Sequence, residues 1–303
     1  MTQKKDILIT GSIALDNIKT PCGEVYEVLG GSATYSSFAA SFFSPVKVIG
    51  KIGTDFPQDY IQKFTAKKID VSGLKISNSK TFRWSGLYEG DMEQAKTLSV
   101  CPEHLQDLHL DIPSHYQNVE CLFLANTDPE IQHSILDSIN VSGPILIDTM
   151  NLWITKKPDS LKKLIQNIDI MLINETEARL FSGKDHLVSA AREISKMGPS
   201  AVIIKKGANG ALLFENENLF SVPAYPVEQL KDPTGAGDSF AGGLTGYIAS
   251  SNNINNNVLR KATIVGSAVA SFTVEDFSTN KLESISINDI ECRVEKLKQM
   301  LKF

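Results

Sequence analysis

The sequence predicts an α/β fold: a three-layer α/β/α sandwich with a mainly parallel central sheet and a small β-sheet lid. Short runs of Ile, Val and Leu recur along the chain without alternating polar residues, as in parallel strands that are covered on both faces. Segments with helical periodicity separate these runs, and this βα alternation is typical of a parallel sheet. The chain has 303 residues, 42% of them hydrophobic, and is long enough to bury such a sheet.

The apolar runs give the strands of this sheet, and the segments between them give its helices. Strands are predicted at 6–11, 46–53, 120–125, 144–148, 169–174, 201–207 and 210–214. Helices are predicted at 31–43, 57–67, 129–139, 159–166, 175–182, 186–196, 236–250 and 256–273. A final helix, capped by Ser286 with Asp289, has an apolar face made of Ile287, Ile290, Val294, Leu297 and Leu301.

Two segments interrupt the βα alternation. Residues 13–29 and 78–100 are rich in β-forming and turn residues and carry no helical stripe. We expect them to form extra strands that make a small sheet over one edge of the main domain, and the alternative is a pair of ordinary surface loops. The whole chain, 1–303, is expected to be a single domain with this lid.

The composition excludes several classes of partner. The net charge is -5, whereas a nucleic-acid-binding protein usually needs a basic stripe. No run approaches the roughly 20 apolar residues of a membrane span, and the N-terminus lacks the pattern of a secretory signal. Cysteines without a CxxC pair and histidines without HxxxH spacing argue against a zinc site and against disulfides, and free thiols favour a reducing, cytoplasmic location. These residues are Cys22, Cys101, Cys121, Cys292, His104, His109, His115, His133 and His186.

Three common glycine-containing motifs are missing. The P-loop pattern GxxxxGK[ST] and the nucleophile elbow GxSxG do not occur. Gly235–Phe240 comes close to a dinucleotide GxGxxG, but Phe240 takes the place of the last glycine and the segment lies near the C-terminus. The sequence therefore favours neither a P-loop enzyme, nor a serine hydrolase, nor a Rossmann dehydrogenase.

The stretch KDPTGAGDSFAGG, from Lys231 to Gly243, has the composition of an anion site at a helix start. Thr234 can cap the helix, and the small residues 235–237 leave backbone N–H groups open to an anion. Asp238 would lie beside that anion, where a carboxylate suits a base that takes a proton from an attacking hydroxyl. The alternative is a capped helix with an acidic first turn and glycines used only for packing.

Other segments near the ends of predicted strands also carry candidate site residues. Asn174 and Glu177 lie three residues apart and suit a hydrated Mg²⁺ with phosphate oxygens, or else a plain helix cap. Lys206 belongs to a glycine turn that is either a simple hairpin or a contact to nucleotide phosphates. Asp16, after the first strand, can accept hydrogen bonds from vicinal hydroxyls, and the glycine pair in 29–43 opens a helix where a polyol can approach the backbone.

Together these segments resemble the ribokinase-like (PfkB) family of carbohydrate and nucleoside kinases. The resemblance rests on Gly30-Gly31 before a helix, NETE, KKGANG and above all DPTGAGDSFAGG, in family order across nearly the whole chain. It implies ATP-dependent phosphorylation of a hydroxymethyl group, with Asp238 as the catalytic base. Its anion hole would consist of Gly235, Ala236 and Gly237.

The resemblance also implies roles for residues on both sides of the cleft. Asn174 and Glu177 would organise Mg-ATP, with Glu177 reaching the metal through water, and Asp232 would help to hold a monovalent cation such as K⁺, as in some members. The implied contacts to ATP are completed by Lys206, Gly207, Gly210 and Thr234. The implied contacts to the acceptor come from Asp16, Gly30 and Gly31. Lid sheets pair into dimers in many relatives, so a homodimer is expected.

The chain departs from the family pattern near the acceptor. Tyr35 stands where the glycine-pair motif often continues to an asparagine, so it is expected either to stack on a substrate ring or to fill the lid hinge. Further candidates for contacts to the acceptor or the phosphates are Asp148 and Asn151, and Arg83 and Trp84 in the lid are candidates for contacts to the acceptor. The predicted function is a kinase of a small sugar or polyol. The alternatives are a nucleoside kinase of the adenosine, inosine or cytidine type, and a binding homologue without catalysis.

Overall fold

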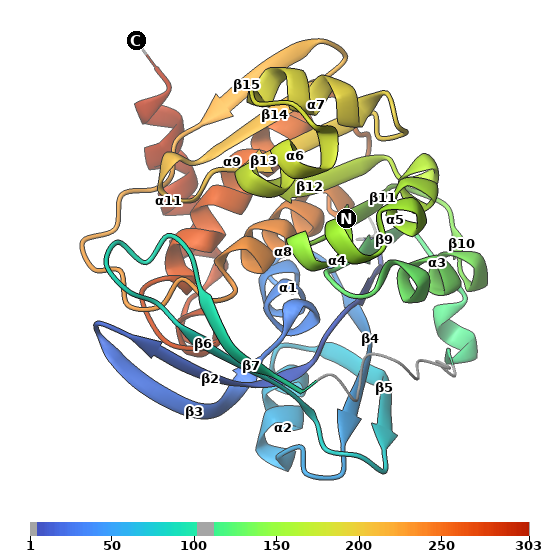
Figure 1. The fold of residues 1–303 in the computed structure, drawn as a ribbon, viewed down its shortest axis with the longest axis vertical. Helices are drawn as coiled ribbons and strands as arrows, with labels where there is room; N and C mark the ends of the chain where they lie inside the picture. Colours follow the sequence, from blue (N-terminus) through green and yellow to red (C-terminus); the bar gives the residue numbers. More distant parts are fainter. Residues whose placement is uncertain (1–4, 102–111, 303) are drawn as a thin grey trace.

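The structure, a computed structural model, describes residues 5–101 and 112–302, so His104 and His109 lie outside the described residues. Within these ranges the main sheet contains nine strands (Figure 1). In their order across the sheet they are β15 (Asn218–Val222), β14 (Ala211–Glu215), β13 (Ala201–Lys205), β12 (Ile170–Asn174), β11 (Ile145–Asp148), β9 (Cys121–Leu124), β1 (Ile7–Thr10), β4 (Val46–Gly53) and β5 (Ile69–Ser77). All pairs from β5 to β13 are parallel, and β14 and β15 pair antiparallel at one end. The predicted mainly parallel sheet is confirmed.

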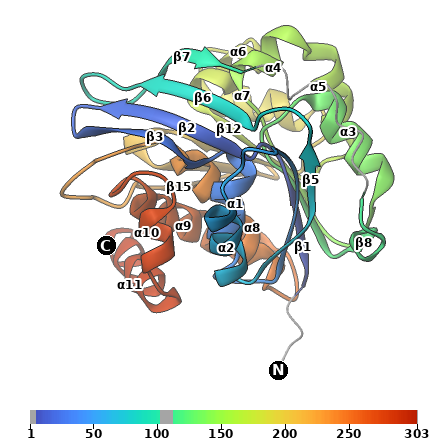
Figure 2. The ribbon, with the colours of Figure 1, turned by 90° about the horizontal axis from the view of Figure 1, so that it is seen from below.

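Helices cover both faces of this sheet, as Figure 2 shows. One face carries α1 (Ser32–Ala40), α2 (Gln58–Ala66), α8 (Ala236–Ala249), α9 (Asn256–Thr273), α10 (Asn280–Ser284) and α11 (Ile287–Met300). The other carries α3 (Pro129–Ser138), α4 (Asn151–Lys156), α5 (Pro158–Leu164), α6 (Glu175–Ser182) and α7 (Leu187–Ser195). Successive strand residues enter opposite cores, as Ile7 and Ile9 do on one side and Leu8 on the other. The apolar runs in the sequence therefore reflect burial on both faces.

The elements that the sequence did not predict are edge strands and short pieces. The outermost strands β5 and β15 are only partly buried, so neither has the continuous apolar run of a central strand. The helices α4 and α10 have six and five residues, too few to show a periodic stripe. A two-stranded sheet of β8 (Asn118–Val119) and β10 (Asn140–Val141) is shorter still.

A separate small sheet forms from the two segments that interrupt the βα alternation. Its order is β3 (Gly23–Gly30), β2 (Ala14–Thr20), β6 (Phe82–Leu87) and β7 (Lys96–Val100). Its Ile18 and Tyr88 pack against Phe277 of the main body. The Thr20 hydroxyl donates to the Lys231 carbonyl at 2.9 Å, so the small sheet lies against the segment that leads into α8 (Figure 2).

No helix in residues 5–101 or 112–302 combines the length and the apolar character that crossing a membrane requires.

Helix α8 packs unusually close to α1 because of its glycines. A Cβ atom on Gly242 would lie 2.2 Å from the carbonyl oxygen of Ser36, which is backbone and cannot move aside. At this close approach the Ser36 hydroxyl donates to the backbone carbonyl of Asp238 at 3.0 Å. The contact therefore fixes the first turn of α8 relative to α1.

We expect Gly242→Ala to lower the free energy of unfolding by about 1–3 kcal/mol, because the added methyl group forces α1 and α8 apart. This loss opposes the gain of about 1 kcal/mol that Ala usually brings to a helix. Urea denaturation measures the difference. The control is Asn257→Ala, at an exposed position of α9, which should change the value by less than about 0.5 kcal/mol. Equal stability of the two variants would contradict the close packing.

Candidate active site

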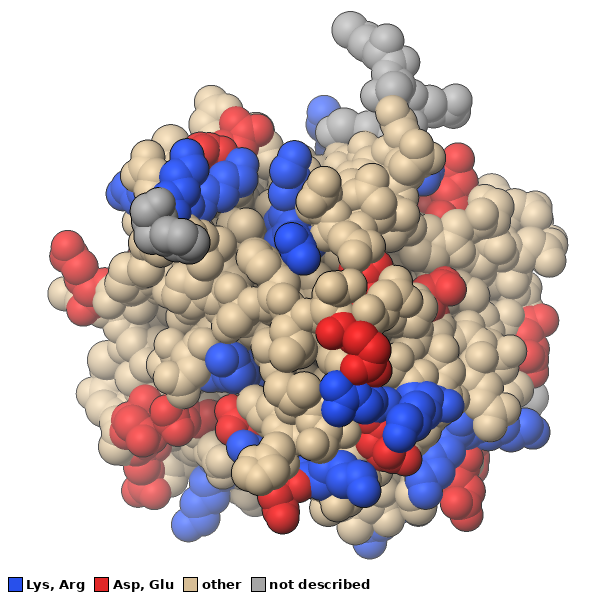
Figure 3. All heavy atoms as spheres, turned by 90° about the horizontal axis from the view of Figure 1, so that it is seen from above, with Lys and Arg blue, Asp and Glu red and all other residues tan. Residues whose placement is uncertain are grey.

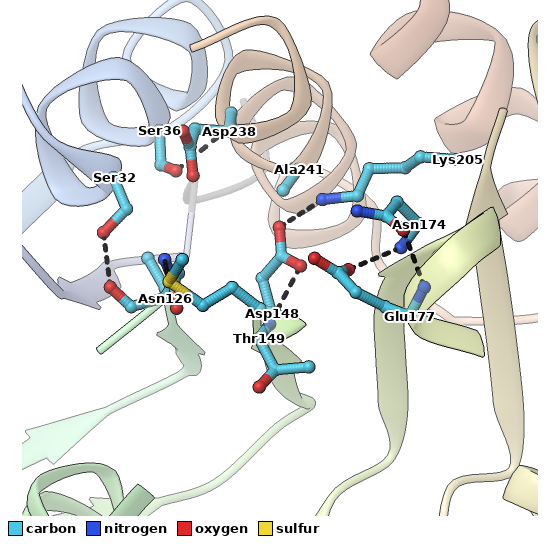
Figure 4. A network of polar contacts seen from close by, with 12 residues as sticks. Ser32, Ser36, Asn126, Asp148, Thr149, Asn174, Glu177, Lys205, Asp238 and Ala241 are labelled. Atoms are coloured by element: carbon cyan, nitrogen blue, oxygen red, sulfur yellow. Dashed lines mark hydrogen bonds and ion pairs between the residues drawn. The ribbon is translucent and has the colours of Figure 1, made fainter. Parts of the chain in front are cut away.

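The candidate site lies where the carboxyl ends of three neighbouring strands meet the N-terminus of α8. Asp148 ends β11, Asn174 ends β12 and Lys205 ends β13. Figure 4 shows these side chains lying close together beside α8, the helix whose first turn contains Asp238. The carboxyl edge of a parallel sheet is the usual place for a ligand in α/β proteins.

The turn that leads into α8 forms a cradle of backbone N–H groups. Gly235 adopts φ 75°, and its missing side chain makes room for the ring of Tyr35, which would lie 2.4 Å from a Cβ atom there. Asp232 accepts a hydrogen bond from the Thr234 N–H at 2.9 Å and so holds the turn. Within the described residues the N–H groups of Gly235, Gly237 and Asp238 have no hydrogen-bond partner. Donors left open at a helix N-terminus fit an anion such as a phosphate group.

Asp238 combines partial burial with a perturbed carboxyl group. Burial, as the main cause, and the negative charge of Asp148 raise its pKa to about 7, although the positive charge of Lys205 acts in the opposite direction. A carboxyl group with a pKa near neutrality can take up a proton in the pH range where enzymes work.

Lys205 forms the main ion pair of the site. Its Nζ lies 2.5 Å from Oδ2 of Asp148, with 16% of the lysine side chain and 3% of the aspartate side chain exposed. Burial alone lowers the pKa of Lys205, but Asp148, Glu177 and Asp238 together raise it. Lys205 therefore stays protonated.

The sequence assigned the nucleotide contact to Lys206 and overlooked Lys205. The predicted strand continued to residue 207, whereas β13 ends at Lys205, in register with Asn174. Lys206 instead begins the turn, where its N–H donates to the Gly210 carbonyl at 2.7 Å. Gly207 and Gly210, with φ 52° and 81°, allow this turn. Two adjacent lysines in the sequence gave no sign of which one faces the cleft.

Asn174 and Glu177 form a capping box at the start of α6. The Asn174 side chain accepts from the Glu177 N–H at 2.8 Å, and the Glu177 carboxylate accepts from the Asn174 N–H at 2.9 Å. Burial raises the pKa of Glu177 to about 7. The described residues contain no group of three or more His, Cys, Asp or Glu side chains that could hold a metal. A metal here would take most of its ligands from water and phosphate, as Mg²⁺ commonly does.

Asp16 and the glycine pair meet on the lid side of the site. The Asp16 carboxylate occupies the space where Gly30 would carry a side chain, 1.9 Å from its Cβ position. Gly31 has φ 96°, and a Cβ atom there would lie 2.4 Å from the Ser12 carbonyl. Asp16 Oδ1 is buried without a hydrogen-bond partner, and burial raises the pKa of Asp16 to about 8 with help from Asp232 and Asp238. Such an unpaired acceptor suits a ligand hydroxyl.

Four other candidate contacts to the acceptor have different surroundings from Asp16 and the glycine pair: Arg83, Trp84, Tyr35 and Asn151. Arg83 pairs with Asp55 at 2.7 Å and with Glu27 at 2.9 Å, so its charge is engaged at the edge of the small sheet. Trp84 lies against Gly86 and donates to Thr97 at 3.2 Å. Tyr35 is 1% exposed with its ring against Gly235, and the side chain of Asn151 is exposed at the start of α4.

Asn126 is a further residue that the sequence analysis did not single out. It comes two residues after the end of β9, and its Oδ1 is buried without a partner while its Nδ2 lies 3.2 Å from the sulfur of Met150. Figure 4 places it beside Ser32, which donates to its carbonyl at 2.8 Å. Its position just beyond a predicted strand was the signal that could have identified it.

Comparisons with known proteins agree with this geometry. The model of the pfkB family of carbohydrate kinases matches residues 7–285. An aminoimidazole riboside kinase from Salmonella typhimurium is 31% identical over 292 residues, covering 90% of each chain. The chain belongs to the pfkB carbohydrate kinase family. A second member, a cytidine kinase from Thermococcus kodakarensis, is 29% identical over 251 residues, which are 80% of this chain and 88% of that protein.

The fold of this pfkB family member also matches solved structures. A double mutant of fructokinase from Vibrio cholerae, solved with fructose, ADP and a potassium ion, superimposes with a TM-score of 0.79 at 18% identity. The match covers 97% of this chain and 100% of that one. At this identity the likeness shows the shared ribokinase fold, which confirms the predicted fold class.

We expect the stability of the ligand-free protein to fall as the pH rises from about 4 to about 8. The pKa values of Asp16, Asp232 and Asp238 are raised to about 8, 6 and 7, mainly by burial. Between the ordinary carboxyl pKa and these values the unfolded chain releases protons that the folded chain retains, so folding weakens with pH. Urea denaturation across this range should show the free energy of unfolding falling with pH, by at most about 1.4 kcal/mol for each unit by which the pKa of a carboxyl group is raised.

Asp16→Asn should flatten this pH dependence, because the amide cannot ionise. The control is Glu291→Gln on the exposed face of α11, which should leave the slope unchanged. A slope that is the same in the wild type and in Asp16→Asn would contradict the assigned burial of the Asp16 charge.

Proposed function

We propose that this chain transfers the γ-phosphoryl group of ATP to a hydroxymethyl group of a small sugar, polyol or nucleoside. The observation that carries the proposal is the placement of Asp238 in the first turn of α8, beside N–H groups that have no partner. A base and an anion cradle at one point are what in-line attack of a hydroxyl on a phosphoryl group requires.

Each of the chain's own groups would have a separate role in the reaction. Asp238 takes the proton of the acceptor hydroxyl as its oxygen attacks phosphorus, and the bond to the leaving ADP oxygen breaks. The N–H groups of Gly235, Gly237 and Asp238, which have no partner, would stabilise negative charge on the transferred group. Ala236, which the sequence also assigned to the anion hole, donates its N–H to the Pro233 carbonyl at 3.2 Å and would have to release it to take part. Closure of the small sheet, now acting as a lid, excludes water and limits hydrolysis of ATP.

Nucleotide and metal would be held along the carboxyl edge of β12 and β13. Glu177 would reach Mg²⁺ through water, with Asn174 fixing its carboxylate. Bound Mg²⁺ would neutralise the charge of the phosphates. The remaining proposed contacts to ATP are Lys206, Gly207, Gly210 and Thr234. Asp232 is fully buried with an unpartnered Oδ2, which supports a monovalent cation such as K⁺ nearby.

The acceptor side suits an acceptor that carries vicinal hydroxyls. Asp16 offers an unpaired carboxylate oxygen next to Gly30 and Gly31, and a ribose unit presents two adjacent hydroxyls to such a group. The similarity to a cytidine kinase and to an aminoimidazole riboside kinase favours a nucleoside over a free sugar. Tyr35 adds no support for base stacking, because its ring is buried against Gly235.

We expect Asp238→Asn to lower kcat by about 10²–10⁴, because the amide cannot accept the hydroxyl proton. The assay follows ATP turnover with Mg²⁺ on a panel of sugars, polyols and nucleosides, with and without K⁺. Acceptor binding should largely persist. The control is Asp91→Asn, an exposed carboxylate beyond β6, which should turn over at the wild-type rate. Wild-type turnover by Asp238→Asn would refute the assigned base, and a wild type inactive on the whole panel would favour a binding protein.

A homodimer through the lid sheet is our proposal for the quaternary state. The outer strands β3 and β7 expose three apolar residues: Tyr26, Leu98 and Val100 are 67%, 56% and 44% exposed. Replacing Leu98 with Lys should shift the protein from dimer to monomer, because it places a charge in the apolar contact. Sedimentation velocity measures the shift, with the exposed Leu219→Lys of β15 as control. A wild type that sediments as a monomer would refute the dimer.

A further inference from the structure

Lys205 is placed to meet a group that lies in the anion cradle. If Gly237 carried a Cβ atom, its nearest neighbour would be Nζ of Lys205, at 3.3 Å. Gly237 also provides one of the N–H groups without a partner. The ammonium group of Lys205 and an N–H donor without a partner therefore lie close together at the start of α8.

The charges around Lys205 are unbalanced. Asp148 from β11, Glu177 from α6 and Asp238 from α8 all act on it, and these three carboxylates surround one ammonium group. Asp148 makes the direct contact at 2.5 Å and is held in turn by the Thr149 N–H at 3.0 Å. Lys205 ends β13, a strand that is paired on both sides, so its stem is held in place while its end can change partner over a short distance.

We infer that Lys205 is a catalytic residue, which donates a hydrogen bond to a non-bridging oxygen of the transferred phosphoryl group while Asp148 holds its ammonium at the cleft as a positioning residue. The inference rests on the proposed function. Lys205 stays protonated throughout and forms no covalent bond, because Asp238 takes the proton and ADP leaves with the electron pair of the broken P–O bond.

A purely structural ion pair would be a different use of the same residues. A buried pair contributes little net stability, because removing both charges from water offsets their attraction. A purely structural pair would also have no reason to lie next to N–H groups that lack partners. Removing a structural pair should change the stability of the fold, whereas removing a catalytic lysine should lower kcat and weaken the binding of a nucleotide that carries a γ-phosphate.

The test compares Lys205→Met with Lys63→Met. Lys63 makes a matched ion pair with Glu283 at 2.8 Å between α2 and α10, remote from the site. Thermal denaturation monitors folding, and steady-state kinetics separate kcat from KM. Calorimetry measures the binding of Mg-ADP and of the non-hydrolysable β,γ-imido analogue of ATP. We expect Lys205→Met to lower kcat by about 10²–10³, the usual effect of removing one donor to a developing negative charge.

The binding data distinguish the γ-phosphate contact from general damage. Affinity for the ATP analogue should fall at least about tenfold, whereas the affinity for Mg-ADP and all constants of Lys63→Met should stay within about threefold. The acidic limb of the kcat/KM profile should move to higher pH in Lys205→Met, because Lys205 lowers the pKa of Asp238. A folded Lys205→Met with wild-type kcat, or with equal losses for both nucleotides, overturns the inference.

Two further variants test the inference if Lys205→Met does not fold. The double variant Asp148→Asn with Lys205→Met removes both charges of the ion pair together, so neither charge of the pair is left without the other, and it should show the same loss of kcat. Lys205→Arg keeps the charge and should retain more activity than Met. If the double variant folds and keeps wild-type kcat, the inference is wrong. If the wild type phosphorylates nothing on the panel, the proposed function fails, while the ATP-analogue comparison still tests Lys205.

Discussion

The first turn of α8 is the constraint on which the rest of the site depends. Gly235 turns the chain into the helix in a left-handed conformation, and the ring of Tyr35 leaves no room for a side chain there. Gly242 then lets α1 approach so closely that Ser36 holds the Asp238 carbonyl. Because this junction is closely packed on both sides, it can keep N–H donors free of partners and still be rigid.

Negative charge is the second feature that shapes the site. Five buried or partly buried carboxyl groups interact around the start of α8, and their pKa values rise mainly because burial removes them from water. They are Asp16, Asp148, Glu177, Asp232 and Asp238. Lys205 is the cation that directly contacts one of them. Such an arrangement costs stability in the empty protein, and it suits a site that operates with bound cations. On the face drawn in Figure 3, by contrast, acidic and basic side chains are interspersed.

The small sheet connects Asp16 to the turn that leads into α8. Asp16 comes from β2, and Tyr88, just beyond β6, accepts a hydrogen bond from Thr234 in the turn before α8. Arg83 does not face the cleft, since Asp55 and Glu27 engage it at the sheet edge. The described contacts thus give this sheet two roles: β2 supplies a polar group to the site, and the edge contacts anchor the sheet to the body.

The sequence by itself determined the sandwich, the small sheet and the composition of the α8 start. Continuous apolar runs and glycines around an acid are local signals, and burial on two faces or a helix start leaves them in any single sequence. Only the tertiary structure decided that Lys205 rather than Lys206 faces Asp238, that Tyr35 lies beneath Gly235, and that Arg83 pairs with Asp55. The physical reason is that the exact end of a strand and the neighbours across a cleft depend on contacts between segments far apart in the chain.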